Sequence, residues 1–567
     1  MARSFPALWL AGFSAGLLAA EAGLPVGGSF VLGTHLAAAL LVTGARGSDG
    51  GGGLLLAATA GVLSLGGPLA VAERDRPARA IEATLEAEIA GARRVGGSTV
   101  LLLERVRGID RRPIPRRLQL WIDRPGEQGG GLADLPRGCR LRARVRIAPI
   151  PARRNPGSPD PAHRAEREGR SARGSLVHPR FHAIAAEGCE PTRWQRYRAA
   201  ARSRLLAAGP GGGLLAALAL GERGAVDPHR RAGIASLGLS HLLAVSGLHL
   251  ALVATLAFGG ARRLATHLPG LRLDGRRVGL LAALGLGAGY ALFTGLGVPV
   301  QRAALLLGAL ALGVVRRHPV APVRALVLAA GLVLLLDPTA LFAPGAQLSF
   351  AATAGLVLAR RREAASLPSF WLDLARVSAT ALLATAPLAA VHFGQTTPLG
   401  LVTNLVAVPA TGMVLLPLAL ATALLAPWSG SAALVELAAG LAGLLLDGAL
   451  GLAAWLPVVA PRRPGLASLV ASLVVMGWAL RKPGTRPRVL GALAVCAVLG
   501  FGPGSEWRPA RPRLVVFDVG QGDAILVQTA EHAVLVDAGG AFRSGGDRGR
   551  QVVVPALAAL GVRRLDL

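Results

Sequence analysis

The sequence is short of charge and of lysine. Only 16% of its 567 residues are charged, against about 25% in a typical soluble domain, and 52% are hydrophobic. This balance argues against a soluble enzyme. Lys482 is the only lysine among 61 basic residues, so nearly all of the positive charge is arginine. Such a bias is typical of GC-rich coding, and where the arginines lie is therefore more informative than the net charge of +29.

Cysteine is also scarce. Three cysteines exclude a disulfide-stapled scaffold and a cysteine-rich zinc module. Cys139 and Cys189 share one long polar segment, and Cys496 lies in an apolar run. The first two either form a disulfide, if the segment faces an oxidising compartment, or remain unpaired buried thiols. A nucleotide-binding loop of the form GxxxxGK[ST] is missing too, so any ATP-driven motor has to be a separate protein.

What the chain does contain is a series of apolar runs of about 15 to 25 residues, from Phe5 to Phe501. They predict a polytopic α-helical membrane protein. We expect transmembrane helices over residues 1–72, a basic β-domain over 73–204, a multi-span domain over 205–505 and an α/β segment over 511–567. The candidate spans are Phe5–Ala20, Gly28–Val42, Gly53–Ala72, Ile234–Phe258, Val278–Gly297, Ala303–Val315, Val323–Leu336, Ala346–Ala359, Phe370–Phe393, Leu405–Leu425, Ala432–Leu456, Leu466–Leu480 and Val489–Phe501.

The segment over 73–204 has about twice as many arginines as acidic residues. Within it, Cys139–Ile147 alternates strictly between apolar residues and arginine, which predicts a strand. With Ser98–Leu103 and Leu118–Ile122 as further strands, we predict a small extramembrane β-barrel. The arginine face is either a groove that follows nucleic-acid phosphates or the solvated exterior of an arginine-rich barrel. Its residues are Arg140, Arg142, Arg144 and Arg146.

Short loops between the later runs differ in charge. Four of them are rich in arginine, whereas Asp337–Pro344 and Gln395–Gly400 have no basic residue. When the spans are counted, the four basic loops fall on the same side of the membrane. The positive-inside rule identifies this side as the cytoplasmic one. The same count places 73–204 and 511–567 together outside the membrane. A basic domain there predicts an acidic partner: nucleic acid, anionic lipid or acidic polysaccharide.

Polar residues interrupt several apolar runs. In the span Ile234–Phe258, His241 and His249 are eight residues apart and are predicted to share one helical face, with Ser246 and Gly247 nearby. This face points either to a water-filled cavity in the bundle or to lipid headgroups, and zinc would lack a third ligand. Other polar positions indicate a hydrated path, although each alone fits a cap or an interhelical hydrogen bond. They are Gln301, Arg302, Gln347, Ser349, His392, Gln395 and Asn404.

Several stretches resemble the ComEC-type DNA-uptake family. The most diagnostic is Leu218–Leu252, with its SHLLAVSGLH core over Ser240–Leu250. Further similar stretches, in the family's order over nearly the whole chain, are Asn155–Leu176, Gly345–Leu356 (GAQLSFAATAGL), Asn404–Pro409 (NLVAVP), Val516–Val527 (VFDVGQGDAILV) and Leu535–Gly540 (LVDAGG).

The resemblance implies a multi-pass channel in the inner (plasma) membrane that passes one DNA strand into the cytoplasm during natural transformation. It implies an OB-like outer barrel that binds DNA without sequence preference, and the beginning of a metallo-β-lactamase-like domain. Implied partners are a separate DNA receptor, a cytoplasmic ATP-driven motor and, in a homo-oligomer, further copies of the chain. The family's core motif includes Ser240, and its glycine turns fall on Asp518, Gly520, Gln521, Gly522, Asp523, Asp537, Gly539 and Gly540.

One part of the family pattern is missing. A His-x-x-x-Asp-His cluster should follow the strand that Leu565–Leu567 begins, and the sequence ends first. We therefore expect a fragment without catalytic residues, metal ligands or nuclease activity, whereas a complete member would hold one or two zinc or manganese ions. The alternatives are a membrane-anchored metal-dependent hydrolase or nuclease, which would not need more than ten spans, and a small-molecule transporter, for which no internal repeat is present.

Overall fold

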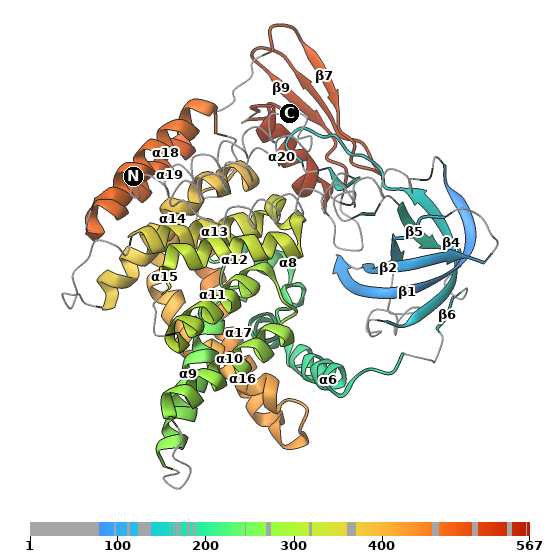
Figure 1. Ribbon diagram of the computed structural model, residues 1–567. Coiled ribbons are helices and arrows are strands. Elements are labelled where there is room, and N and C mark those ends of the chain that lie inside the picture. The colour runs from blue at the N-terminus through green and yellow to red at the C-terminus, as the bar shows by residue number, and fades with distance from the viewer. Residues whose placement is uncertain are drawn as a thin grey trace, which may run out of the picture. The chain divides into compact units, whose positions relative to one another are not determined.

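The structure of the chain, a computed structural model, forms two compact units (Figure 1). One unit contains the described residues up to Arg196 and those from 509 onward, and the other contains the described residues from Tyr197 to 501. The predicted spans Phe5–Ala20, Gly28–Val42 and Gly53–Ala72 lie outside the described residues. The structure describes residues 77, 79–95, 98–109, 114–122, 138–158, 160–162, 165, 169–170, 172–178, 182–184, 189–243, 245–267, 274–316, 320–359, 370–455, 464–482, 484–501, 509–540, 547–562 and 564–567.

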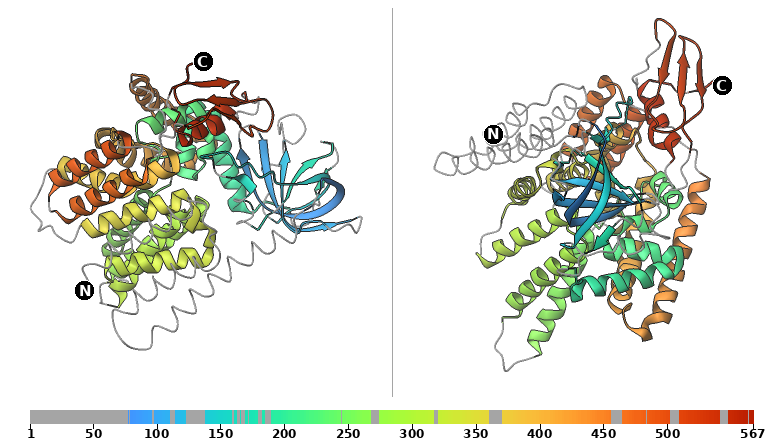
Figure 2. Two further views of the ribbon diagram at one scale, coloured as in Figure 1. Left: turned by 90° about the horizontal axis from the view of Figure 1, so that it is seen from above. Right: turned by 90° about the vertical axis from the view of Figure 1, so that its right-hand side faces the viewer.

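The first unit begins with a β-barrel, which confirms that prediction. Strands pair in the order β1-β2-β3-β5-β4, and β4 pairs with β1 to close the barrel. β3 and β5 run parallel, the other pairs run antiparallel, and β6 extends the sheet beside β4 (Figures 1 and 2). The strands are β1 (Ile81–Val95), β2 (Ser98–Gly108), β3 (Leu118–Ile122), β4 (Arg140–Pro149), β5 (Ala172–Leu176) and β6 (His182–Ile184).

The predicted alternation of β4 is present. Leu141, Ala143, Val145 and Ile147 are buried in the barrel core, and the four intervening arginines are exposed. The structure also forms the Cys139–Cys189 disulfide, which was one of the two alternatives for these residues. Cys139 directly precedes β4 and is fully buried, so the bond fixes a distant loop to the barrel core.

The same unit ends in a small three-stranded antiparallel sheet. Its strands are β7 (Arg513–Val516), β8 (Ile525–Gln528) and β9 (Ala533–Val536), in that order. After the sheet, a π-helical turn, η8 (Gly549–Val553), is followed by the helix α20 (Val554–Ala559). The helix packs on one face of the sheet through Val553 and Ala556.

The second unit is a bundle of helices. Among the described residues, four segments are long and apolar enough to cross a membrane: Val298–Val315, Phe370–Phe393, Gly400–Leu425 and Ala432–Ala454. The helices are α6 (Arg193–Ala207), α7 (Gly209–Leu220), η2 (Arg223–Ala225), α8 (Pro228–Ser236), α9 (Gly247–Thr266), α10 (Gly275–Phe293), α11 (Val298–Val315), α12 (Pro322–Leu336), η4 (Pro338–Phe342), α13 (Pro344–Ala359), α14 (Phe370–Phe393), α15 (Gly400–Pro409), η6 (Ala410–Leu415), α16 (Leu416–Leu425), η7 (Ser429–Ser431), α17 (Ala432–Ala454), α18 (Leu466–Arg481) and α19 (Thr485–Phe501).

The predicted span Ile234–Phe258 is wrong as a single helix. α8 ends at Ser236, α9 begins at Gly247, and His241 lies in a turn between them. His241 and His249 therefore do not share a helical face. The cause is Gly238, whose φ of +76° ends α8 in a Schellman motif: the N–H of Gly238 donates to Ala235 and that of Leu239 to Ile234.

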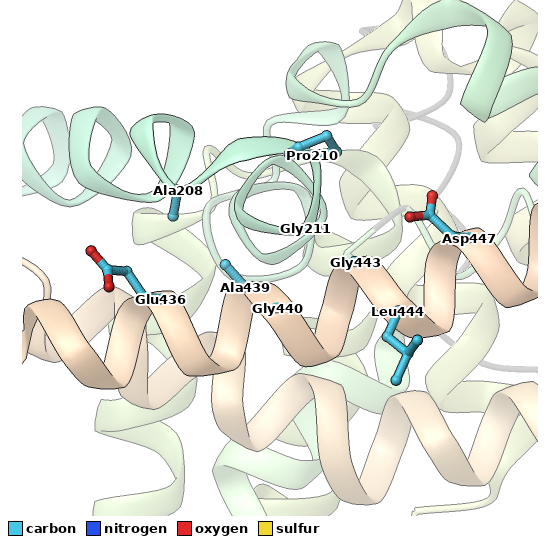
Figure 3. Close-up of a pocket in the computed structure, with 9 residues that line it drawn as sticks. All are labelled: Ala208, Pro210, Gly211, Glu436, Ala439, Gly440, Gly443, Leu444 and Asp447. Atoms are coloured by element: carbon cyan, nitrogen blue, oxygen red, sulfur yellow. The ribbon is translucent and has the colours of Figure 1, made fainter.

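Helix α7 was not among the predicted spans, although it lies at the centre of the second unit. Every residue from Gly211 to Leu220 is buried, as expected for a helix that is apolar on all sides. Its glycines allow close approach to other backbones: a Cβ on Gly211 would lie 1.9 Å from the carbonyl oxygen of Ala439. Figure 3 shows this crossing of α7 over α17.

We expect Gly211→Ala to destabilise the helical unit, because the added methyl group would overlap the backbone of α17. Overpacking of this kind costs about 1–3 kcal/mol or more, which would appear as a lower melting temperature of the protein in detergent. Gly440→Ala is the matched control, since Gly440 is exposed on α17 and a Cβ there would contact nothing within 4 Å. Equal melting temperatures for the two variants would contradict this account of the crossing.

We also expect loss of the disulfide to weaken the barrel. The bond joins residues 50 positions apart, and removing a disulfide typically costs about 2–4 kcal/mol. Cys139→Ser should therefore lower the denaturant midpoint of the barrel, followed by hydrogen–deuterium exchange of its strand peptides. Cys496→Ser is the control, because Cys496 is a free cysteine of α19. A midpoint that is unchanged in Cys139→Ser would show that the bond adds no stability.

Candidate functional site

The candidate site surrounds the segment between α8 and α9, where the described residues 237–243 and 245–246 are not helical. Helix α15 packs on the beginning of this break. The hydroxyl of Thr403 donates to the carbonyl oxygen of Leu237 at 2.8 Å, and a Cβ on Gly238 would lie 3.0 Å from the Cα of Gly400. Two separate features therefore require a glycine at position 238: the positive φ and the close contact with α15.

The end of the break is capped by its own side chains. The backbone N–H of Ser246 donates to Nδ1 of His249 at 3.1 Å, and the Ser246 hydroxyl lies 2.8 Å from the same nitrogen. Because Nδ1 accepts a backbone hydrogen bond, the proton of the neutral ring is on Nε2. His249 is only 1% exposed, and its Nε2 has no hydrogen-bond partner. The ring therefore has a buried donor that no described group accepts.

Two predicted members of the motif lie at the exposed side of the break. Ser240 and His241 are both exposed, and Nδ1–H of His241 donates to the carbonyl oxygen of Gly238 at 3.2 Å. His241 thus stabilises the turn, whereas His249 lies in the interior. The structure does not bring these two histidines together on one helix.

Arg302 of α11 lies against the start of α9. A Cβ on Gly247 would be 3.3 Å from a terminal nitrogen of its guanidinium group. Nη1 donates to the carbonyl oxygen and the hydroxyl of Ser349 in α13, and the guanidinium carbon is 6.0 Å from the centre of the Phe350 ring. Arg302 is 9% exposed. No carboxylate in the described part of the chain forms a salt bridge with it, so its charge is buried without an acidic partner.

Gln347 connects α13 to its neighbours. Its Nε2 donates to the carbonyl oxygen of Leu341 at 2.8 Å, and Nε2–H of His392 in α14 donates to its Oε1 at 2.5 Å. Gln347 is 2% exposed, so these bonds satisfy an otherwise buried amide. This pair fits the interhelical hydrogen bond that is the simpler explanation of a polar residue in a span.

Four of the predicted polar residues have a buried atom without a hydrogen-bond partner among the residues that the structure describes. They are His249 (Nε2), Gln301 (Oε1), Arg302 (Nε) and Asn404 (Oδ1). Buried polar atoms are nearly always paired with protein, water or a ligand. Their occurrence in the polar set that the sequence singled out indicates that this part of the bundle is hydrated or binds a polar ligand.

One feature near the site was missed from the sequence. The backbone between Pro409 and Pro417 forms the π-helical segment η6, and a Cβ on its Gly412 would lie 3.7 Å from the side chain of Leu248. Proline lacks an N–H group, so a bond of the regular α-helical series is lost at each of the two positions. The two prolines are the signal in the sequence that could have indicated this irregular helix. Segments of this type are frequent at functional sites.

The barrel arginines have acidic neighbours. Across the β1–β4 pairing, Glu88 lies opposite Arg140, Glu86 opposite Arg142, and Glu82 opposite Arg146. Arg144 approaches Glu82 to 3.7 Å, with both side chains about half exposed. The arginine face of β4 is thus part of a surface of mixed charge. The sequence pattern of β4 alone did not show this, because it does not reveal which strand pairs with β4.

The predicted glycine turns of the C-terminal segment are present. The φ angles are +89° at Gly520, +92° at Gly522, +74° at Gly539 and +63° at Gly540. Asp537 accepts hydrogen bonds from the N–H groups of Ala538 and Gly539, so its carboxylate stabilises its own turn. Within the described residues, no three His, Cys, Asp or Glu side chains are grouped to hold a metal ion.

A surface pocket of about 460 Å³ lies between α7 and α17 (Figure 3). It is lined mainly by small residues, with Glu436 and Asp447 at its edges. Asp447 is paired with Arg230 of α8 at 2.8 Å. None of the predicted polar residues lines this pocket, and we do not assign the site to it.

We expect His249→Ala to destabilise the start of α9, because Ser246 would lose the acceptor for its backbone N–H. Loss of a helix cap costs about 0.5–2 kcal/mol, measurable as a lower melting temperature in detergent. His267→Ala is the control, since His267 is exposed at the other end of the same helix. If both variants melt like the unchanged protein, the Ser246–His249 contact is not a cap.

Comparison with known proteins finds similar sequences over the residues that form this site. Residues 218–486 match the family described as "Competence protein". The chain is 34% identical over 375 residues to "Competence protein ComA" of Neisseria gonorrhoeae, covering 62% of this chain and 49% of that protein. It is 27% identical over 372 residues to "ComE operon protein 3" of Bacillus subtilis (strain 168), covering 62% and 47%.

A third relative is "Uncharacterized protein YcaI" of Escherichia coli (strain K12), which is 29% identical over 372 residues, covering 61% of this chain and 47% of that protein. The matches thus span about half the length of the curated relatives. No solved structure matches the chain. The matched residues 218–486 contain both the break and the polar residues around it.

Proposed function

We propose that this chain, whose residues 218–486 match the family described as "Competence protein", carries single-stranded DNA across the plasma membrane during natural transformation. The observation that carries the proposal is Arg302. It is a buried cation with no described carboxylate beside it, in a unit with four helices apolar enough to span a membrane. Ionisable residues in such surroundings are costly and typically mark the path of a substrate or ion.

A passing DNA strand supplies what the site lacks. Its phosphates are anionic acceptors, and the groups available to them are donors: the guanidinium of Arg302 and Nε2–H of His249. The Ser349 contacts hold only Nη1 of the guanidinium, so its Nε stays available. Because these donors recognise phosphate and not bases, the proposed path is independent of DNA sequence.

The barrel of the first unit fits this proposal as a second place where DNA binds. The closed five-stranded barrel is OB-like in its strand order and in its parallel β3–β5 pair, and OB-folds bind oligonucleotides over strands 2 and 3. We therefore place DNA binding on β2 and β3 as well as on the arginines of β4. The outward location of the barrel, the DNA receptor, the ATP-driven motor and a homo-oligomer belong to the same proposal.

We interpret the sheet of β7, β8 and β9 as the start of a metallo-β-lactamase-like domain, on its DVGQGD and DAGG turns. In a complete family member, one or two divalent ions would activate water for phosphodiester hydrolysis. The described residues provide no such group of ligands, so no hydrolytic step is assigned to them. Nothing in the structure favours the alternative of a membrane-anchored hydrolase over a channel.

We expect Arg302→Gln to lower the transformation frequency about 10- to 100-fold, since a hydrogen bond to a charged group is worth about 1.5–3 kcal/mol. The transformation frequency of Arg302→Lys should lie between those of Arg302→Gln and the unchanged protein. Lysine keeps the positive charge but loses the planar set of donors of the guanidinium group. Arg316→Gln is the control: Arg316 is exposed directly after the same helix. Surface binding of DNA should be unchanged in all three. Normal transformation by Arg302→Gln, at equal protein levels, would contradict the proposed path.

A further inference from the structure

A short segment after the barrel, Arg153–Gly157, contacts the C-terminal segment of the same unit. Asn155 makes two hydrogen bonds with the backbone of Asp518: its Nδ2 donates to the carbonyl oxygen at 2.8 Å, and its Oδ1 accepts from the N–H at 2.9 Å. A carboxamide supplies both a donor and an acceptor, so it pairs with a peptide group as another backbone would. Asn155 is 8% exposed, which shields both bonds from water.

Arg153 holds the turn that follows β7. Its guanidinium group lies over Gly520, where a Cβ would be 2.6 Å from one of its terminal nitrogens. Its Nε is 3.9 Å from the carboxylate of Asp518. Gly520 has a φ of +89°, so glycine is required there both by the backbone conformation and by the space that the arginine fills. The contact thus explains one glycine of the DVGQGD turn.

Gly157 makes the third contact, with helix α20. A Cβ on this glycine would lie 2.5 Å from the carbonyl oxygen of Pro555 and 2.8 Å from the Cβ of Ala559. Its φ is +75°, and it lies in a turn closed by a hydrogen bond from Ser158 to Asn155. The segment therefore contacts both the sheet side and the helix side of the C-terminal segment, at positions that are more than 360 residues away in the sequence.

From these contacts we infer that Arg153–Gly157 is a docking segment that joins the barrel and the C-terminal segment into one extramembrane body. Both parts then lie on the same side of the membrane. The chain between them must cross the membrane an even number of times, whichever of its shorter helices span. This constraint is independent of the charges of the loops, and it does not depend on what the protein transports.

Two experiments on the full chain test the inference, one in the membrane and one in detergent. For sidedness, single cysteines replace Arg105 in β2 and Glu531 in the β8–β9 turn, both exposed, in a Cys496→Ser background. A membrane-impermeant maleimide is applied to intact spheroplasts and, separately, to inverted vesicles. We expect both cysteines to be labelled in the same preparation. Labelling of the two in opposite preparations would overturn the inference.

For the docking contact, hydrogen–deuterium exchange of the purified protein in detergent reports on the N–H of Asp518. We expect Asn155→Ala to raise exchange in the peptide over 517–523 about tenfold. Arg154→Ala is the matched control, since Arg154 is the exposed neighbour. Unchanged barrel exchange in both variants shows that Asn155→Ala is folded. Equal exchange over 517–523 in the two variants would overturn the docking role even if both parts share a side.

Discussion

A helix that stops inside an apolar bundle leaves backbone N–H and C=O groups without water to bind, and the helical unit is arranged around one such stop. Non-helical backbone is tolerated at membrane depth only where protein or a water-filled cavity covers it. At Leu237–Ser246 the ends are satisfied locally, by the Schellman motif at Gly238 and by the contact between Ser246 and His249. Thr403 of α15 satisfies a further carbonyl group from outside.

The same break accounts for where the polar residues lie. Because α9 begins only at Gly247, its first turn presents a glycine to α11, and the guanidinium of Arg302 fits against it. A larger residue at 247 would displace this cation. The glycine at the start of α9 therefore leaves space for a buried charge next to the motif.

The elements that follow from local patterning were predictable. Strand β4 has alternate arginines, and α14 has the predicted bounds, because each pattern repeats within the element itself. Helix α7 was missed because its GPGGG start reads as a loop, whereas glycine there serves close packing. The break was missed because Ser-x-x-His is not the usual capping box of serine and glutamate. The glutamates opposite the β4 arginines needed strand pairing, which no single strand reveals.

The central claim is that a DNA strand passes the break beside Arg302, and photo-cross-linking during uptake tests it most directly. A benzophenone amino acid replaces Leu248, which lies beside the break and contacts η6, or Leu281, which is exposed on α10 away from it. Labelled DNA is supplied to competent cells, and the protein is isolated after irradiation. The account predicts a DNA adduct at position 248 and none at 281. An adduct at 281 alone, or none at 248 in cells that take up DNA, would contradict it.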